Sequence, residues 1–245
     1  MSVVTVKEQG KVSIIAINRP EKGNAISRQV ALDLQAAFAA FDKSDQRVAV
    51  LTGEGDRAFS TGADVTDLPE LWRCIPTVGI TTEKPIIAAT SGWVVGGALV
   101  AVMMADLCVA SETTKFSYPE AKLGFTGGMI AGLAGRIPHK IAMEIMLLGR
   151  AVDARRAYEA GLVNQVVAAG THVEEAVKMA TELAGYSPMV LKTIKRFVIE
   201  GVLPAGPSEQ MARTHRDLGL VRESEDAQEG IRAFKEKRAP NYVGR

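Results

Sequence analysis

Cysteine and histidine are both scarce in this chain, which has two cysteines and three histidines among 245 residues. Cys74 and Cys108 have no nearby cysteine or histidine, so neither a disulfide framework nor a metal site is indicated. His139, His172 and His215 also lack the spacing of metal ligands. We therefore expect no metal and a reducing, cytoplasmic location.

The chain also lacks an excess of charge of one sign, because 29 Lys and Arg residues stand against 28 Asp and Glu residues. A net charge of +1 carries no general signature of nucleic-acid binding. The longest uncharged apolar run, Trp93 to Ala105, is shorter than the roughly 18 residues that a membrane-spanning helix needs. The N-terminus, Met1 to Gln9, shows no targeting pattern. We predict no nucleic-acid partner and no membrane association.

Hydrophobic residues make up 47% of the chain, which is enough for a sizeable core. Four apolar or β-branched runs predict buried strands: Val12–Ile17, Val48–Thr52, Pro85–Ala89 and Leu107–Ala110. Helices are predicted after the first three of these runs: Ser27–Phe41 with Ser27 as its N-cap, Gly62–Leu71, and Gly96–Ala105. Repeated strand–helix units predict an α/β core.

After Glu120 the sequence becomes helical almost without strands. Stop and cap signals predict helices over Pro138–Leu148, Asp153–Ala160, Pro188 to Gly201 with Ser187 as cap, Ser208–Val221 and Asp226–Lys237. We predict an α/β core over residues 1–185 and a helical C-terminal region over residues 186–245.

Two glycine-bearing segments each follow a predicted strand. The first is Ala58–Val65, and the second is Ser91–Ala98, in which Gly96 and Gly97 precede an apolar helix. Glycine lets backbone N–H groups approach a ligand closely, and a helix N-terminus attracts developing negative charge. The alternatives to such a ligand site are an ordinary turn in the first segment and close helix–sheet packing in the second. The two segments alone leave both interpretations open.

A third segment, Lys115–Gly124, presents the carboxylate of Glu120 among apolar neighbours. Such surroundings raise a carboxyl pKa and suit it to proton transfer near neutral pH, although a solvated surface glutamate is the alternative. Ser60 and Ser117 have no GxSxG elbow or histidine base, which argues against a serine triad. The glycines of Gly124–Gly128 match neither the GxGxxG nor the Walker pattern.

Five groups of residues follow one another along the chain in a fixed order: Ile17–Pro20 with Asn24–Ala25; Ala58–Val65; Lys84–Ala89 with Gly92 and Gly96–Gly97; Asp106 with Phe116–Glu120; and Ala233–Pro240. Together, from about Val12 to Tyr242, they resemble the enoyl-CoA hydratase/isomerase (crotonase) family. The resemblance implies a spiral of ββα repeats forming two roughly perpendicular sheets, with the C-terminal helices used for assembly into trimers or hexamers built from two trimers.

The resemblance also implies coenzyme A thioesters as substrates, with coenzyme A part of the substrate and no separate cofactor. It assigns the backbone N–H groups of Ala63 and Gly97 to an oxyanion hole and Glu120 to acid/base chemistry. By the same resemblance we expect the substrate to contact Thr61, Gly62, Asp64, Val65, Gly96 and Val100.

One departure from the family pattern bears on the reaction. The best-known hydratases of the family carry two glutamates, and the position of the first falls on Val100 here, while the second is kept as Glu120. The stretch between Asp64 and Lys84 is also shorter than in typical members, which leaves the acyl group open.

A single carboxylate suffices to move a proton between C2 and C4 of an enoyl thioester, so we predict double-bond isomerisation. Hydration assisted by Tyr118 or Thr126, as in a lyase, is the close alternative. Hydrolysis on the same fold and a non-catalytic acyl-CoA-binding protein are the remaining ones.

Overall fold

Two β-sheets form the centre of the computed structural model, which describes residues 2–245. The larger sheet has the order β1-β2-β3-β5-β7-β10 and consists of β1 (Val4–Gln9), β2 (Val12–Ile17), β3 (Val48–Gly53), β5 (Ile86–Thr90), β7 (Leu107–Ser111) and β10 (Gln165–Val167). The smaller sheet has the order β4-β6-β8-β9 and consists of β4 (Ala58–Ser60), β6 (Trp93–Val95), β8 (Lys115–Ser117) and β9 (Val152–Asp153). All four strands predicted from the sequence lie in the larger sheet.

The chain alternates between the two sheets in successive repeats. β3 leads to β4, β5 leads to β6 and then to α2 (Gly97–Met104), and β7 leads to β8 and then to α3 (Glu120–Leu123). Neighbouring strands from successive repeats are parallel in both sheets. This arrangement confirms the α/β core and the ββα spiral.

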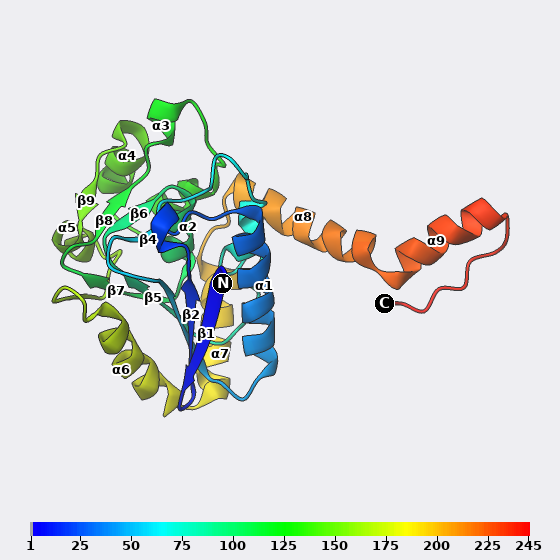
Figure 1. Cartoon of the computed structure of the whole chain (residues 1–245), viewed down its shortest axis with the longest axis horizontal. Helices are drawn as coiled ribbons and strands as arrows, with labels where there is room; N and C mark the ends of the chain where they lie inside the picture. Colours follow the sequence, from blue (N-terminus) through cyan, green and yellow to red (C-terminus); the bar gives the residue numbers. More distant parts are fainter. Residues whose placement is uncertain (1) are drawn as a thin grey trace.

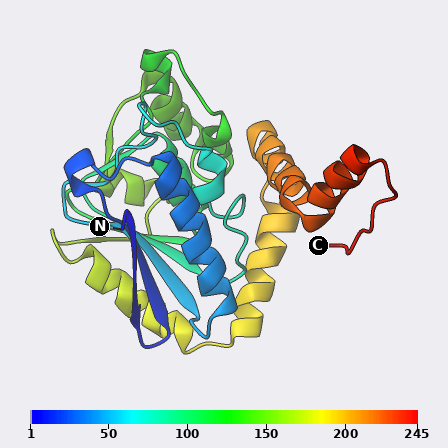
Figure 2. The ribbon, with the colours of Figure 1, turned by 45° about the vertical axis from the view of Figure 1, so that its right-hand side comes forward.

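The central strands of the larger sheet, β2, β3, β5 and β7, are covered on both faces, which explains why they are apolar without a polar alternation. Along β3, Ala49 and Leu51 pack into one core, whereas Val48 and Val50 pack into another on the opposite face. The first core includes α1 (Arg28–Lys43), where the Ser27 side chain accepts a hydrogen bond from Val30 N at 3.3 Å and caps the helix. The second core is closed by α6 (His172–Ala184), a helix absent from the sequence-based predictions. The two helices lie on opposite sides of the sheet in Figures 1 and 2.

The helix predicted over Gly62–Leu71 was wrong. The chain there is irregular up to a short 3-10 helix, η2 (Leu71–Cys74). Asp64 Oδ1 accepts hydrogen bonds from Thr66 N at 3.1 Å and Thr66 Oγ1 at 2.6 Å, so its side chain closes a local turn instead. Pro69 adds a residue that cannot donate a helical hydrogen bond.

The remaining short elements connect the spiral to the C-terminal part. They are η3 (Met129–Gly135), α4 (His139–Leu148) and α5 (Ala154–Glu159), whereas η1 (Pro20–Lys22) lies between β2 and α1. α4 ends at Gly149 in a left-handed conformation, as the sequence predicted, and the predicted helix over Asp153–Ala160 is α5, which Asp153 caps. The prediction that strands are almost absent after Glu120 needs one correction, because β9 and β10 extend the two sheets there.

The C-terminal helices leave the sheets and form a projecting arm. α7 (Pro188–Phe197) and η4 (Val198–Val202) run along the core, whereas α8 (Pro207–Glu223) and α9 (Glu225–Glu236) extend away from it (Figures 1 and 2). Apolar side chains on this arm are exposed, including Phe234 at 85% and Ile231 at 60%. Within residues 2–245, no helix is both long enough and apolar enough to pass through a membrane.

Candidate functional site

Three segments predicted to carry chemistry follow three neighbouring parallel strands. Ala63 comes after β4, Gly97 after β6 and Glu120 after β8, and these strands are adjacent in the order β4-β6-β8. Because parallel strands are about 4.8 Å apart and end at the same edge of the sheet, the three segments are brought together there. Gly62 has a positive φ of +88° and no side chain, and both features let the first segment lie against the second. A Cβ atom on Gly62 would be 2.7 Å from Val95 O and 3.5 Å from Gly97 N.

The Ala63 amide is oriented by its contacts with the segment before α1. Ile26 N donates to Gly62 O at 2.8 Å, and Asp64 N donates to Ile26 O at 2.8 Å. In a trans peptide the C=O and N–H groups point in opposite directions, so the Ala63 N–H points away from Ile26. Within residues 2–245 this N–H donates to no protein acceptor and remains available to a ligand.

The Gly97 amide is the first of the apolar helix α2. Gly96 precedes it with a φ of 58° and donates its own N–H to Ser117 O at 3.0 Å, which ties the helix start to β8. The first N–H groups of a helix have no partner inside the helix, and they lie at the positive end of its dipole. Gly97 and Ala63 therefore each supply an N–H group at the same sheet edge.

Glu120 faces this helix start from the end of β8. Its Oε1 would lie 2.6 Å from a Cβ atom on Gly96, so the carboxylate occupies space that only a glycine leaves free. Oε2 is buried and accepts no hydrogen bond from residues 2–245. Burial raises the pKa of Glu120 to about 7, from an ordinary value of 4.5. A carboxyl group with this pKa can both remove and return a proton near neutral pH.

We expect the pH dependence of turnover to report this group. If ionised Glu120 must accept a proton, kcat/KM for a substrate with an acidic C2–H should rise to a plateau with a midpoint near pH 7. Stability should change in the opposite sense: the folded state binds the proton more tightly than the unfolded state, so stability falls as pH rises from 4.5 to about 7. Rate profiles and pH-dependent melting of the wild type and the E120Q variant measure both effects, and a flat rate profile would contradict the assignment.

Two hydroxyl groups near Glu120 in the sequence pair with each other. Tyr118 Oη and Thr126 Oγ1 are 2.8 Å apart. Burial raises the pKa of Tyr118 above its usual value, and the charge of Glu120 adds to this, whereas the hydrogen bond with Thr126 opposes it. The Tyr118 phenol therefore stays protonated and can donate or accept a hydrogen bond near Glu120.

Val100 and Leu71 are two hydrocarbon side chains of α2 and its surroundings. Val100 lies one turn into α2 and is only 2% exposed. Leu71 packs on the helix start, since a Cβ atom on Gly97 would lie 2.5 Å from Leu71 Cδ2. Leu71 was not among the predicted site residues, because the wrongly predicted helix gave no indication that its side chain reaches Gly97.

The other residues predicted to contact the substrate differ in how exposed they are. Gly62 and Gly96 are buried, and Asp64 accepts a hydrogen bond from Arg19 Nη1 at 3.1 Å. Thr61 is exposed and Val65 is 82% exposed, so their proposed contacts with substrate stay predictions.

A separate cavity of about 510 Å³ lies between α7 and the end of α2. Its lining includes Met104, Leu162 and Leu191 but none of Ala63, Gly97 or Glu120. The free amides and the perturbed carboxyl group make the sheet edge, rather than this cavity, the candidate active site.

Comparison with known proteins identifies the family of the chain. The family model described as enoyl-CoA hydratase/isomerase matches residues 7–245. The chain is 32% identical to an (E)-benzylidenesuccinyl-CoA hydratase from Thauera aromatica, with 98% of this chain and 99% of that protein covered. It is 31% identical to a 2,3-dehydroadipyl-CoA hydratase from Escherichia coli, with both chains fully covered.

A solved structure indicates the same family. The crystal structure of a carnitinyl-CoA hydratase from Mycobacterium avium matches with a TM-score of 0.78 at 30% identity, and both chains are fully covered. The family-model match spans far more than half of the chain. The chain therefore belongs to the enoyl-CoA hydratase/isomerase (crotonase) family of acyl-CoA enzymes.

Proposed function

We propose that this protein is an enoyl-CoA isomerase that moves a double bond by means of one carboxylate. The observation that carries the proposal is Glu120, with a pKa of about 7, beside the start of α2, a helix that carries the hydrocarbon side chain of Val100 and no second carboxylate. The free N–H groups of Ala63 and Gly97 supply the charge stabilisation that the reaction needs. Two buried free thiols, Cys74 and Cys108, support our proposal of a cytoplasmic location.

The proposed reaction starts with the thioester oxygen hydrogen-bonded to the two backbone amides. Ionised Glu120 removes a proton from C2 of a 3-enoyl thioester, and the electron pair spreads over C2, C4 and the thioester oxygen as a dienolate. The amides stabilise the charge on the oxygen. Protonated Glu120 then returns the proton to C4, which gives the 2-enoyl thioester with no net gain or loss of atoms.

Hydration is the second candidate, and two observations favour it. The relatives cited above are named hydratases. The Tyr118 and Thr126 hydroxyl groups, 2.8 Å apart and near Glu120 in the sequence, offer hydrogen bonds that a water molecule would need. Val100 argues against this reaction because its side chain can neither donate nor accept a hydrogen bond.

A panel of 2-enoyl, 3-enoyl and 3-hydroxyacyl-CoA esters separates the two candidates. We expect 3-enoyl esters to be converted to 2-enoyl esters without formation of 3-hydroxyacyl-CoA. Rapid appearance of 3-hydroxyacyl-CoA from 2-enoyl esters, with slow interconversion of the enoyl isomers, would replace isomerase by hydratase.

A glutamate at position 100 should shift the balance towards hydration. In V100E a second carboxylate could hold water against C3, and positioning a reactant can lower a barrier by several kcal/mol. We expect faster water addition than in the parent, with a smaller change in isomerisation. The measurement is the ratio of the two rates, followed together with the melting temperature.

Burial is the risk for this variant, because an unpartnered glutamate at a site that is 2% exposed costs stability or stays protonated. V100Q is the matched control, since it has nearly the same shape and no ionisable group. A folded V100E variant that hydrates no faster than V100Q would show that position 100 does not select the reaction.

We further propose that the protein assembles as a homotrimer or as a dimer of trimers. The exposed apolar side chains of the projecting arm, Ile231 and Phe234 among them, would be removed from water in such an interface. Light scattering at micromolar concentration should give about three or six times the 26.1 kDa chain mass. A mass near that of one chain would reject the proposal.

A further inference from the structure

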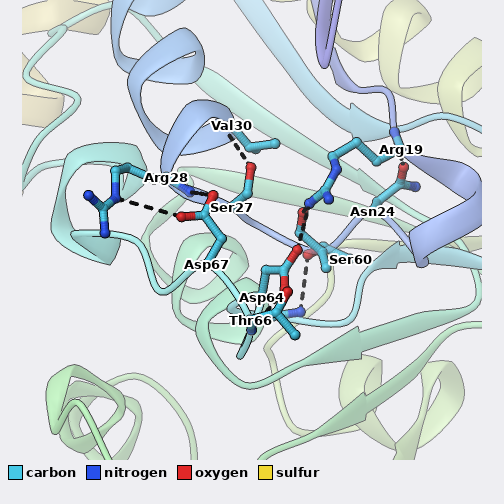
Figure 3. A network of polar contacts seen from close by, with 11 residues as sticks. Arg19, Asn24, Ser27, Arg28, Val30, Ser60, Asp64, Thr66 and Asp67 are labelled. Carbon is cyan, nitrogen blue, oxygen red and sulfur yellow. Dashed lines mark hydrogen bonds and ion pairs between the residues drawn. The ribbon is translucent and has the colours of Figure 1, made fainter.

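A partly buried ion pair lies next to the Ala63 amide. Arg19 Nη1 is 3.1 Å from Asp64 Oδ2, and the two side chains are only 17% and 12% exposed. Asp64 is the residue that follows Ala63, whereas Arg19 precedes η1. Figure 3 shows the pair at the centre of a polar network that also includes Asn24, Ser60 and Thr66.

Arg19 also holds a peptide group that leads to Ala63. The same Nη1 atom donates to Ala25 O at 2.8 Å. The peptide group of Ala25 O contains the N–H of Ile26, and this N–H donates to Gly62 O at 2.8 Å. The peptide group of Gly62 O in turn contains the N–H of Ala63. Two trans peptide groups therefore connect the guanidinium group to the amide that faces the substrate.

The hydrogen bonds from Arg19 through the two peptide groups all point the same way, from donor to carbonyl oxygen. A cation that binds a peptide oxygen draws electron density from its N–H, and hydrogen bonds arranged head to tail strengthen one another. Arg19 thus makes the Ile26 N–H a stronger donor to Gly62 O, and this bond makes the Ala63 N–H a stronger donor. The series also fixes the plane of the Gly62–Ala63 peptide and hence the direction of its N–H.

Asp64 keeps Arg19 in place. Its second oxygen, Oδ1, is occupied by Thr66 N and Thr66 Oγ1, so the carboxylate cannot turn away from the guanidinium group without losing those bonds. The loop from Arg19 to Asn24 is itself rigidly built, because Asn24 accepts from Arg19 N at 3.0 Å and donates to Ala58 O at 2.7 Å.

We propose that Arg19 and Asp64 are positioning residues for the oxyanion hole, which orient and polarise the Ala63 N–H through the Ala25–Ile26 and Gly62–Ala63 peptide groups. The inference rests on the proposed function, because it assumes that the Ala63 amide binds the thioester oxygen. Neither side chain needs to touch the substrate for this role.

A second ion pair between the same two segments provides a matched control. Arg28 and Asp67 are 3.7 Å apart and are 71% and 47% exposed, and they lie to the other side of Ser27 in Figure 3. R19M and R28M therefore each remove one arginine and one ion pair, of which the Arg28 pair is the more exposed, but only R19M removes the donor to Ala25 O.

The test measures the hole directly with a chromophore. The absorption band of a bound 2,4-dienoyl-CoA moves to longer wavelength when its thioester oxygen accepts strong hydrogen bonds. In the E120Q background, which is expected to leave the probe unconverted, we expect the parent and R28M to show this shift and R19M to show a clearly smaller one at saturation. With Glu120 intact, R19M should lower kcat about 10-fold with little change in KM, which is less than the roughly 10²–10³ for loss of a whole donor.

Two outcomes separate failure of the proposed function from failure of this inference. Absence of the shift in the E120Q parent would refute the oxyanion hole itself. A normal parent with an undiminished shift in R19M, even at a lower melting temperature, would show that the pair is only structural and would overturn this inference alone. If R19M does not fold, D64N and R19K replace it: D64N should reduce the shift, and R19K, which keeps one charged donor, should retain more of it than D64N does.

Discussion

Replacement of Glu120 by glutamine is expected to lower turnover by about 10²–10⁴ while acyl-CoA binding persists. Glutamine has nearly the same shape, so it fits the space beside Gly96 that the carboxylate occupies. It cannot accept and return a proton, and the proposed reaction uses no other carboxylate. Steady-state rates at saturating substrate, with binding measured separately by calorimetry, give the two quantities.

Two comparisons make this prediction specific. E120D keeps an acid but withdraws it by one methylene group, and it should retain more activity than E120Q if proton transfer is the function. E120Q should also melt at a higher temperature than the wild type above pH 7, because the ionised carboxylate is held in a site that disfavours its charge. Undiminished turnover in E120Q would move the acid/base chemistry to another residue.

Replacement of Gly97 by proline should lower kcat by roughly 10²–10³ through loss of one hydrogen-bond donor to the oxyanion. Proline suits the first position of a helix, where the missing N–H breaks no helical hydrogen bond. The variant thus tests the amide with little cost to α2. The measurement is kcat on the best substrate of the enoyl-CoA panel.

The structure requires a control for the added side-chain atoms. Any Cβ atom at position 97 meets Leu71 Cδ2 at 2.5 Å, so Leu71 must move in every variant. G97A adds the same Cβ atom and keeps the N–H, and it should lose much less activity than G97P. L71A in combination with each variant removes the contact. Equal losses in G97A and G97P would attribute the defect to Leu71 and not to the amide.

Much of the sheet core was predictable, because β3 and its neighbours are buried on both faces and so consist of β-branched and apolar residues. α6 was missed although Val173 and Val177 pack on the sheet, because the fully buried positions of its packing face, Ala176 and Ala180, are small residues with a weak apolar signal. The helix over Gly62–Leu71 was wrong because Asp64 competes for backbone hydrogen bonds, an effect of local chemistry that periodicity does not register.

Only some residues of the candidate site could be predicted from the sequence. Gly97 and Glu120 could be singled out because glycine pairs and a carboxylate at a strand end are visible in the sequence. The contact of Leu71 with Gly97 and the position of Arg19 next to Ala63 depend on segments that are far apart along the chain. Such contacts are set by the packing of whole repeats, and no spacing rule within one segment indicates them.

The use of main-chain N–H groups at Ala63 and Gly97 has a consequence for how this protein tolerates mutation. A side-chain donor is lost by many single substitutions, whereas a backbone donor is removed only by proline. Random substitution should therefore abolish acid/base chemistry at position 120 far more readily than it abolishes capture of the thioester oxygen. Variants that still bind acyl-CoA but have lost or changed their reaction should be common among its mutational neighbours, and such variants are starting points for new activities.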